Sequence, residues 1–173
     1  MCIRDRDLFI EYFNRHPEVK LIIAPHVIDE NHLVEIIRKL KRPYVRYTRA
    51  DEKNVRKADC LIIDCFGLLS SIYRYGEIAY IGGGFGVGIH NTLEAAVYGI
   101  PVIFGPKYQK FQEAIHLLEA KGGFSIKSYE ELKILLDRML GDEDFLREAG
   151  KNAGAYVTDN AGTTDKVLGM INF

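Results

Sequence analysis

The sequence predicts an α/β protein built on a doubly wound, mostly parallel sheet. Short apolar runs rich in β-branched residues recur along its 173 residues, and amphipathic helical patterns separate them. Pro, Gly or Asp residues bound most of these runs, as is typical of buried parallel strands. Glycine and polar residues gather where the runs end. A chain of this length is expected to form one well-buried domain.

The first half of the chain contains three short apolar runs that we expect to be strands: 21–24, 44–47 and 60–63. The helical patterns around them cover three segments: 6–16, 30–40 and 67–74. In the second of these, Leu33, Ile36, Ile37 and Leu40 have the spacing of a stripe that faces a core. This alternation favours right-handed crossovers between parallel strands.

The second half continues the same alternation. Its expected strands are short again: 78–81, 102–104 and a last one at 124–126. Its expected helices become longer towards the end of the chain: 91–98, 110–121, 128–140, 142–156 and 160–171. The apolar residues of 128–140 keep the helical period, so this helix is expected to pack one face on the sheet.

Charge and cysteine content exclude several classes of protein. The 23 Lys and Arg residues nearly balance the 24 Asp and Glu residues, so no global field points to nucleic acid. Cys2, Cys60 and Cys65 form no C-x-x-C pair, which favours reduced cytosolic thiols. No apolar run approaches the roughly 20 residues that span a bilayer, so we expect a soluble polypeptide. The five histidines lack metal-ligand spacing, so neither a metal nor a cofactor is expected.

Distinctive residues follow four of the expected strands. Pro25-His26 follows the first, 64–67 follows the third, 82–91 follows the fourth, and 105–107 follows the fifth. Ligands of open α/β sheets bind outside the carboxyl ends of the strands. We therefore predict that these segments share one crevice.

The glycine-rich loop at 82–88 leads into the expected start of a helix at Asn91. Its glycines allow positive φ and close approach of a ligand, and the N–H groups of a helix start favour an anion. The loop fits no G-x-G-x-x-G pattern, and no G-K-[ST] follows, which excludes a P-loop. The residues alone leave two interpretations open: a loop that binds phosphate, or a structural turn followed by a capping box of Asn91 and Glu94.

Three stretches of this region resemble one family. They are the glycine triplet at 82–84, the run His90-Asn91-Thr92-Leu93-Glu94-Ala95-Ala96, and Gly99-Ile100-Pro101-Val102 with Gly105-Pro106. Together they resemble the C-terminal domain of the bacterial Kdo transferases, which attach 3-deoxy-D-manno-octulosonic acid (Kdo) to the lipid A precursor. Two upstream segments, 21–26 and 64–69, keep register with that resemblance.

The resemblance implies a GT-B glycosyltransferase, in which two Rossmann-like domains face each other across a cleft. Residues 8–173 are similar to the donor-binding domain of that fold, and residues 1–7 are expected to be a leader that is not native to it. The N-terminal acceptor domain, with the membrane-associating surface and a glutamate general base, is expected to be absent. No catalytic residue is therefore expected here, and the chain alone should be inactive.

The resemblance also carries the family's contacts to CMP onto this chain. His26 stands where many members have Arg, and histidine is a weaker, pH-dependent cation. Phe66-Gly67-Leu68 stands where many have Met-Gly-Glu, so Leu68 offers only its backbone. The residues expected to bind CMP-Kdo are Pro25, His26, Phe66, Gly67, Leu68, Gly83, Gly84, His90, Asn91, Thr92, Leu93, Glu94, Lys107 and Lys110.

Chemistry suggests a role for several of these residues. The N–H groups near Gly83, Gly84 and Asn91 would hold the CMP phosphate, and the Glu94 carboxylate would accept hydrogen bonds from ribose hydroxyls. Lys107 and Lys110 would neutralise the phosphate or the Kdo carboxylate. Structural alternatives stand beside these roles: a histidine such as His90 also serves to fix a loop, and lysines are usually solvated.

The resemblance thus predicts the donor-binding half of an enzyme that transfers Kdo from CMP-Kdo to a lipid A precursor in lipopolysaccharide biosynthesis. The complete enzyme would act at the cytoplasmic face of the bacterial inner membrane, with the acceptor and the membrane contacted through the other domain. One alternative is a GT-B enzyme or an epimerase that uses a UDP-sugar. The other is a non-enzymatic receiver module, with Asp64 after the third strand as phosphoacceptor and Lys107 after the fifth strand.

Overall fold

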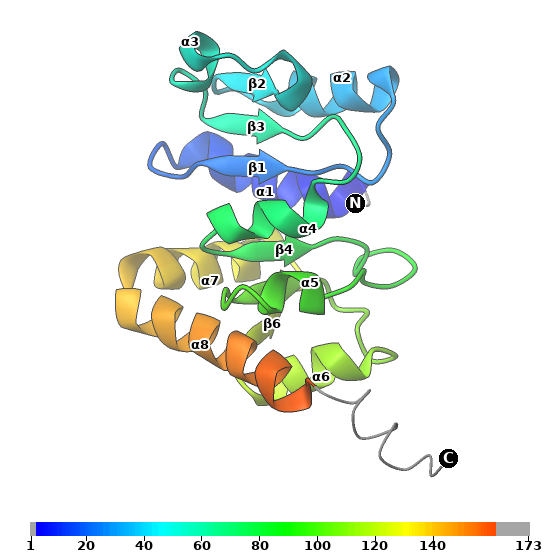
Figure 1. Cartoon of the computed structure of the whole chain (residues 1–173), viewed down its shortest axis with the longest axis vertical. Coiled ribbons are helices and arrows are strands. Elements are labelled where there is room, and N and C mark those ends of the chain that lie inside the picture. The colour runs from blue at the N-terminus through cyan, green and yellow to red at the C-terminus, as the bar shows by residue number, and fades with distance from the viewer. Residues whose placement is uncertain (1–2, 162–173) are drawn as a thin grey trace, which may run out of the picture.

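The computed structural model describes residues 3–161, in which helices alternate with short strands (Figure 1). The N-terminal half contains, in chain order, α1 (Ile3–Arg15), β1 (Leu21–Ile23), α2 (Glu30–Lys39), β2 (Tyr44–Arg46), η1 (Tyr47–Arg49), α3 (Glu52–Val55) and β3 (Cys60–Ile62). All three strands predicted for this half are confirmed within one residue at each end. The 3-10 helix η1 and the helix α3 were not predicted.

The C-terminal half contains α4 (Leu69–Ile72), η2 (Tyr73–Tyr75), β4 (Ala79–Ile81), α5 (Leu93–Ala96), β5 (Val102–Phe104), α6 (Gln112–Glu119), β6 (Gly123–Ser125), α7 (Tyr129–Gly141) and α8 (Glu143–Asn160). The predicted strands are again confirmed within one residue. The helix predicted over 91–98 is shorter than expected, and α8 is longer. Beyond residue 161, the helix predicted over 160–171 lies outside the described residues.

The α/β class with parallel strands is confirmed, but the strands form two sheets. Their orders are β1-β3-β2 and β4-β5-β6, and every pairing is parallel. Within residues 3–161, no strand pair joins β1 to β4, and in Figure 1 α4 is drawn across the space between these two strands. The single doubly wound sheet predicted from the sequence is therefore divided at a seam between β1 and β4.

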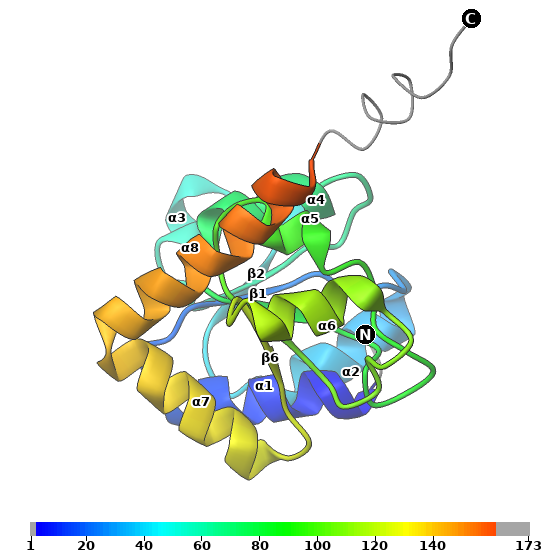
Figure 2. The same ribbon diagram turned by 90° about the horizontal axis from the view of Figure 1, so that it is seen from below.

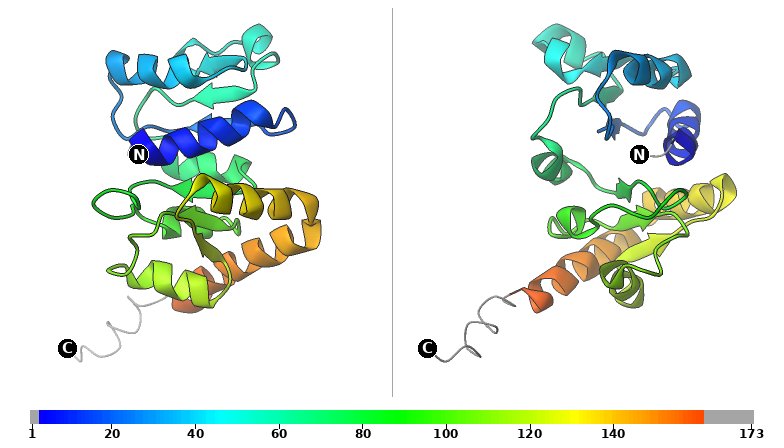
Figure 3. Two further views of the ribbon diagram at one scale, coloured as in Figure 1. Left: turned by 180° about the vertical axis from the view of Figure 1, so that it is seen from behind. Right: turned by 90° about the vertical axis from the view of Figure 1, so that its right-hand side faces the viewer.

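Helices cover both faces of the two sheets. In Figure 3, α1, α2 and α7 lie on one side and α4 and α5 on the other. Figure 2 shows α8 crossing the molecule on the side opposite α1 and α7. The seam therefore lies between α1 on one face and α4 on the other, which gives the doubly wound arrangement that the alternating pattern predicts.

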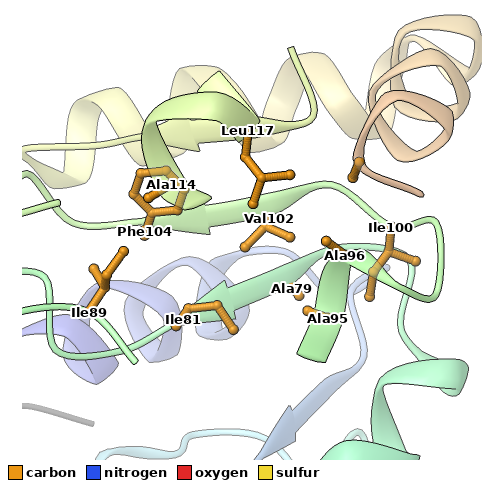
Figure 4. Packing of buried hydrophobic residues seen from close by; sticks show 11 residues of the cluster. Ala79, Ile81, Ile89, Ala95, Ala96, Ile100, Val102, Phe104, Ala114 and Leu117 are labelled. Carbon is orange, nitrogen blue, oxygen red and sulfur yellow. The ribbon is translucent and has the colours of Figure 1, made fainter. Parts of the chain in front are cut away.

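Each sheet has its own core. The core of the C-terminal sheet includes Val102 and Phe104 of β5, and Figure 4 shows Leu117 of α6 pointing towards Val102. Alanines of α5, α6 and α8 are fully buried in it, and their small side chains let the helices approach the sheet closely: Ala95, Ala96, Ala114 and Ala153. Because the helices lie so close to the sheet at these alanines, a larger side chain there would overpack the core.

Helix α1 contributes to the cores of both halves. Its Ile10 and Phe13 pack with β1, β3 and α2, while Tyr12 packs with Leu136 and Met139 of α7. The Tyr12 hydroxyl also donates to Asp137 at 2.8 Å. The helix begins at Ile3, so it crosses the boundary at residue 7 that the sequence suggests for a leader. That assignment stays a prediction.

Capping residues explain where several helices begin. Asp29, Ser128 and Asp142 each accept a hydrogen bond from a backbone N–H in the first turn of α2, α7 and α8. The unpredicted α3 has a complete capping box between Asp51 and Asn54. The sequence signal for this helix is Asp51 followed three residues later by Asn54.

Candidate functional site

A cavity of about 790 Å³ fills the seam between the two sheets. At the carboxyl edge of the strands it is lined by seven of the predicted site residues: Pro25, His26, Phe66, Gly67, His90, Asn91 and Glu94. They come from the segments that follow β1, β3 and β4. Three of the four strand ends that the sequence distinguishes therefore meet at one cavity.

The other seven predicted residues do not line this cavity: Leu68, Gly83, Gly84, Thr92, Leu93, Lys107 and Lys110. Thr92 is only 3% exposed, and Leu93 packs against the core of the C-terminal sheet. Lys107 and Lys110 are exposed on the segment after β5. Their roles in ligand binding stay predictions.

The start of α5 is fixed by Asn91. Its Oδ1 accepts a hydrogen bond from the Leu93 N–H at 3.0 Å, and its Nδ2 lies 3.2 Å from Oε1 of Glu94. The cap predicted for this helix is thus present in altered form, because Thr92 rather than Asn91 is the N-cap residue. Since α5 has only four residues, its dipole is too weak to attract an anion by itself. The Asn91 side chain instead orients the Glu94 carboxylate at the cavity.

The glycine loop is shaped mainly by packing. A Cβ on Gly84 would lie 2.6 Å from the backbone of Gly105, so the loop can contact the end of β5 only with glycine at that position. Of the loop glycines, only Gly83 and Gly88 have positive φ. The Gly83 N–H donates to Asp5 Oδ2 of α1 at 2.7 Å. This N–H is therefore paired with α1 in the structure, and its role in holding a phosphate stays a prediction.

Lys107 holds the same loop from the other side. Its ammonium donates to the Gly86 carbonyl at 2.8 Å, and its backbone N–H donates to the Gly84 carbonyl at 2.9 Å. These contacts tie the segment after β5 to the segment after β4. Lys107 therefore has a structural role in holding the loop, and its contact with a ligand stays a prediction.

Comparisons with known proteins agree with this geometry. No family model matches the chain. The chain is 35% identical over 134 residues to a 3-deoxy-D-manno-octulosonic acid transferase of Aquifex aeolicus, covering 76% of this chain and 36% of that protein. A transferase of the same name from Rickettsia conorii is 29% identical over 170 residues, covering 95% of this chain and 34% of that protein. These matches make the chain a relative of the Kdo transferases.

The matched portion is about a third of the length of these Kdo transferases. In fold, the chain is similar to the C-terminal CMP-Kdo binding domain of WaaA from Acinetobacter baumannii. The TM-score is 0.75 at 18% identity, covering 88% of this chain and 82% of that one. The C-terminal domain of a Francisella tularensis group 1 glycosyl transferase gives 0.60 at 17% identity, covering 90% of this chain and 76% of that one. The Rossmann-like half of a GT-B fold is thereby confirmed.

Two histidines lie face to face at the cavity of this Kdo transferase homologue. The rings of His26 and His90 are stacked, with centroids 5.3 Å apart and planes inclined by 21°. Burial and the neighbouring His26 lower the pKa of His90, although the Asp5 carboxylate opposes that shift. His90 is therefore neutral near pH 7 in the ligand-free chain.

Asp64, on the segment after β3, is the centre of a polar network that sequence reasoning missed. Its carboxylate accepts from the Arg46 guanidinium at 2.7 Å and from the Thr48 N–H and hydroxyl at 2.9 and 2.6 Å. Burial alone would raise the pKa of Asp64, but the hydrogen bonds from Thr48 and Arg46 outweigh it and hold this pKa at about 2. With three donors on a buried carboxylate, Asp64 is unsuited to be the phosphoacceptor of a receiver module.

The Asp64 network makes the stability of the fold depend on pH. Because the pKa of Asp64 is about 2 in the folded chain and 3.8 ordinarily, its contribution is present above pH 4 and is lost as the pH falls towards 2. The shift corresponds to about 2 kcal/mol of unfolding free energy. Chemical denaturation at a series of pH values should show this loss in the wild type and not in Asp64→Asn. Equal pH profiles for the two proteins would contradict the assigned pKa.

No group of three or more His, Cys, Asp or Glu side chains within 3–161 is placed to hold a metal ion. None of the helices in that range is long and apolar enough to cross a membrane.

Proposed function

We propose that this chain binds CMP-Kdo as the donor-binding part of a Kdo transferase. The observation that carries the proposal is the meeting of Pro25-His26, Phe66-Gly67 and the Asn91–Glu94 pair at one cavity. Kinship with the transferases from Aquifex and Rickettsia supplies the chemical class of the ligand. A crevice at the carboxyl ends of parallel strands is where an α/β sheet binds a nucleotide.

The residues at the cavity divide into three kinds of contact. Glu94, oriented by Asn91, presents carboxylate oxygens that accept hydrogen bonds from ribose hydroxyls. Phe66 is 82% exposed at the cavity and offers an aromatic face to a base. His26 and His90 offer N–H donors to an anion. Each part of a nucleotide thus has a matching group.

In the complete enzyme, transfer would break the bond between Kdo and the CMP phosphate. Negative charge then grows on the phosphate as it leaves, and donors fixed before the reaction stabilise that charge most effectively. We assign that role to the two histidines at this cavity. The general base, the lipid A precursor and the contact with the inner membrane are proposed to belong to the facing acceptor domain.

Nucleotide titration tests the proposal. We expect CMP to bind the chain, and Glu94→Gln to weaken binding about tenfold by removing a charged hydrogen-bond acceptor. Asn91→Ala should weaken it less, since it frees Glu94 without removing it. Glu119→Gln, on the exposed face of α6, is the matched control and should bind as the wild type does.

The same titration separates the alternatives. UMP is expected to bind more weakly than CMP. Binding of UMP as tight as or tighter than that of CMP would favour an enzyme that uses a UDP-sugar. Absence of CMP binding, or CMP binding that neither Glu94→Gln nor Asn91→Ala changes, would overturn the proposal.

A further inference from the structure

The histidines at the cavity form a closely spaced pair of titratable rings. His26 is on the segment that follows β1, and His90 is on the segment that follows β4 and the glycine loop, so they come from the two sheets on either side of the seam. Their rings are stacked with centroids 5.3 Å apart, so the pair can readily carry only one positive charge. A second proton would place two like charges side by side.

The charged groups around this histidine pair come from three other segments. Asp5 of α1 interacts with His90, but its carboxylate already accepts the Gly83 N–H. Arg6 of α1 also lines the cavity, is 1% exposed, and has one guanidinium nitrogen 3.1 Å from His32. Glu94 of α5 lines the cavity as well and is held by Asn91. Cys65, after β3, and Tyr73 of η2, which interacts with Glu94, also line the cavity.

We propose that the histidine pair takes up one proton when an anionic nucleotide binds, so that donor affinity rises as the pH falls through the neutral range. This inference rests on the proposed donor site and names how that site is regulated. Burial lowers the pKa of His90 in the empty cavity, and an anion beside the two stacked rings favours the protonated form of the pair. By linkage, the proton that the anion brings in strengthens the binding of the anion by the same factor.

The size of the effect follows from the linkage. If one proton is taken up for each ligand bound, affinity increases by up to about tenfold for each unit by which the pH falls. The dependence should span about pH 8 to pH 6, where imidazole titrates. A permanently charged side chain at position 26 would remove most of it, since Arg does not lose its proton in this range.

The probe for the test is the methyl ester of CMP, a phosphodiester whose single charge does not change over this range. Its affinity is measured calorimetrically between about pH 6 and pH 8 in two buffers of different ionisation heat, which also gives the number of protons taken up. Wild type, His26→Gln, His90→Gln and His26→Arg are compared. His116→Gln is the control, because His116 contacts Tyr156 on the far helices and not the cavity.

We expect the wild type and His116→Gln to bind more tightly at low pH, with proton uptake close to one. His26→Gln and His90→Gln should lose most of that dependence, and His26→Arg should bind at about pH 8 several times more tightly than the wild type. Binding that is equally strong at every pH, without proton uptake, would overturn the histidine-pair proposal and leave the donor site standing. No binding by any variant at any pH would overturn both.

Discussion

Gly83→Ala is expected to lower the unfolding free energy by about 3 kcal/mol or more and to abolish nucleotide binding. Gly83 has a φ of +99°, a conformation that alanine adopts only with strain. Its Cβ would also lie 2.1 Å from the Gly88 carbonyl oxygen, a backbone atom that cannot move without reshaping the loop. Chemical denaturation and CMP titration of the variant measure the two effects.

Gly141→Ala is the matched control for that substitution. Gly141 ends α7, and a Cβ there would meet no atom within 4 Å. Its unfolding free energy should stay within about 1 kcal/mol of the wild type. An equal unfolding free energy for Gly83→Ala and Gly141→Ala would show that the glycine loop does not have the conformation described here.

Arg42→Met is expected to lower the unfolding free energy by about 3 kcal/mol. The Arg42 guanidinium donates to the carbonyls of Phe13, His16 and Val19 at 2.8–2.9 Å and to that of Pro17 at 2.8 Å. These carbonyls lie at and after the end of α1, where a helix leaves acceptors without partners of its own. Removing the guanidinium takes the donor from the Pro17 and Val19 carbonyls, while those of Phe13 and His16 keep only the backbone N–H groups of His16 and Val19.

Two further variants separate hydrogen bonding from charge at this position. Arg42→Lys keeps the charge but cannot reach several carbonyls with one ammonium group, so it should recover only part of the loss. Arg38→Met, on the exposed side of α2, should change the stability by less than about 0.5 kcal/mol. Full recovery by Arg42→Lys would indicate that the ion pair with Asp59 at 3.3 Å, and not the set of carbonyls, is what Arg42 contributes.

The positions of the strands could be predicted because local sequence patterns determine them. Each strand of the α/β fold is a short apolar run between helix signals, so its position could be predicted within a residue. The convergence of the segments after β1, β3 and β4 could also be predicted, because parallel strands place their carboxyl ends at one edge. For the same reason, seven cavity-lining residues were named in advance.

The remaining features depend on contacts between distant residues, which no local pattern records. The seam exists because β1 and β4 do not pair with each other, and nothing in these two short apolar runs indicates which strands they pair with. The hydrogen bond from Gly83 to Asp5 joins residues 78 positions apart. The same is true of Asp64, whose partners Arg46 and Thr48 come from the neighbouring strand β2 and from η1.

A titration of the nitrogen-labelled chain with CMP, followed by amide chemical shifts, tests directly whether the cavity at the strand ends binds the nucleotide. We predict that the amides of His26, Gly67 and Asn91 shift together with a single affinity, because these residues line one cavity. Amides beside the separate hollow between α1 and α2, such as that of Lys41, should stay in place. Shifts confined to the surroundings of Lys41, or an unchanged spectrum at saturating CMP, would contradict the donor site.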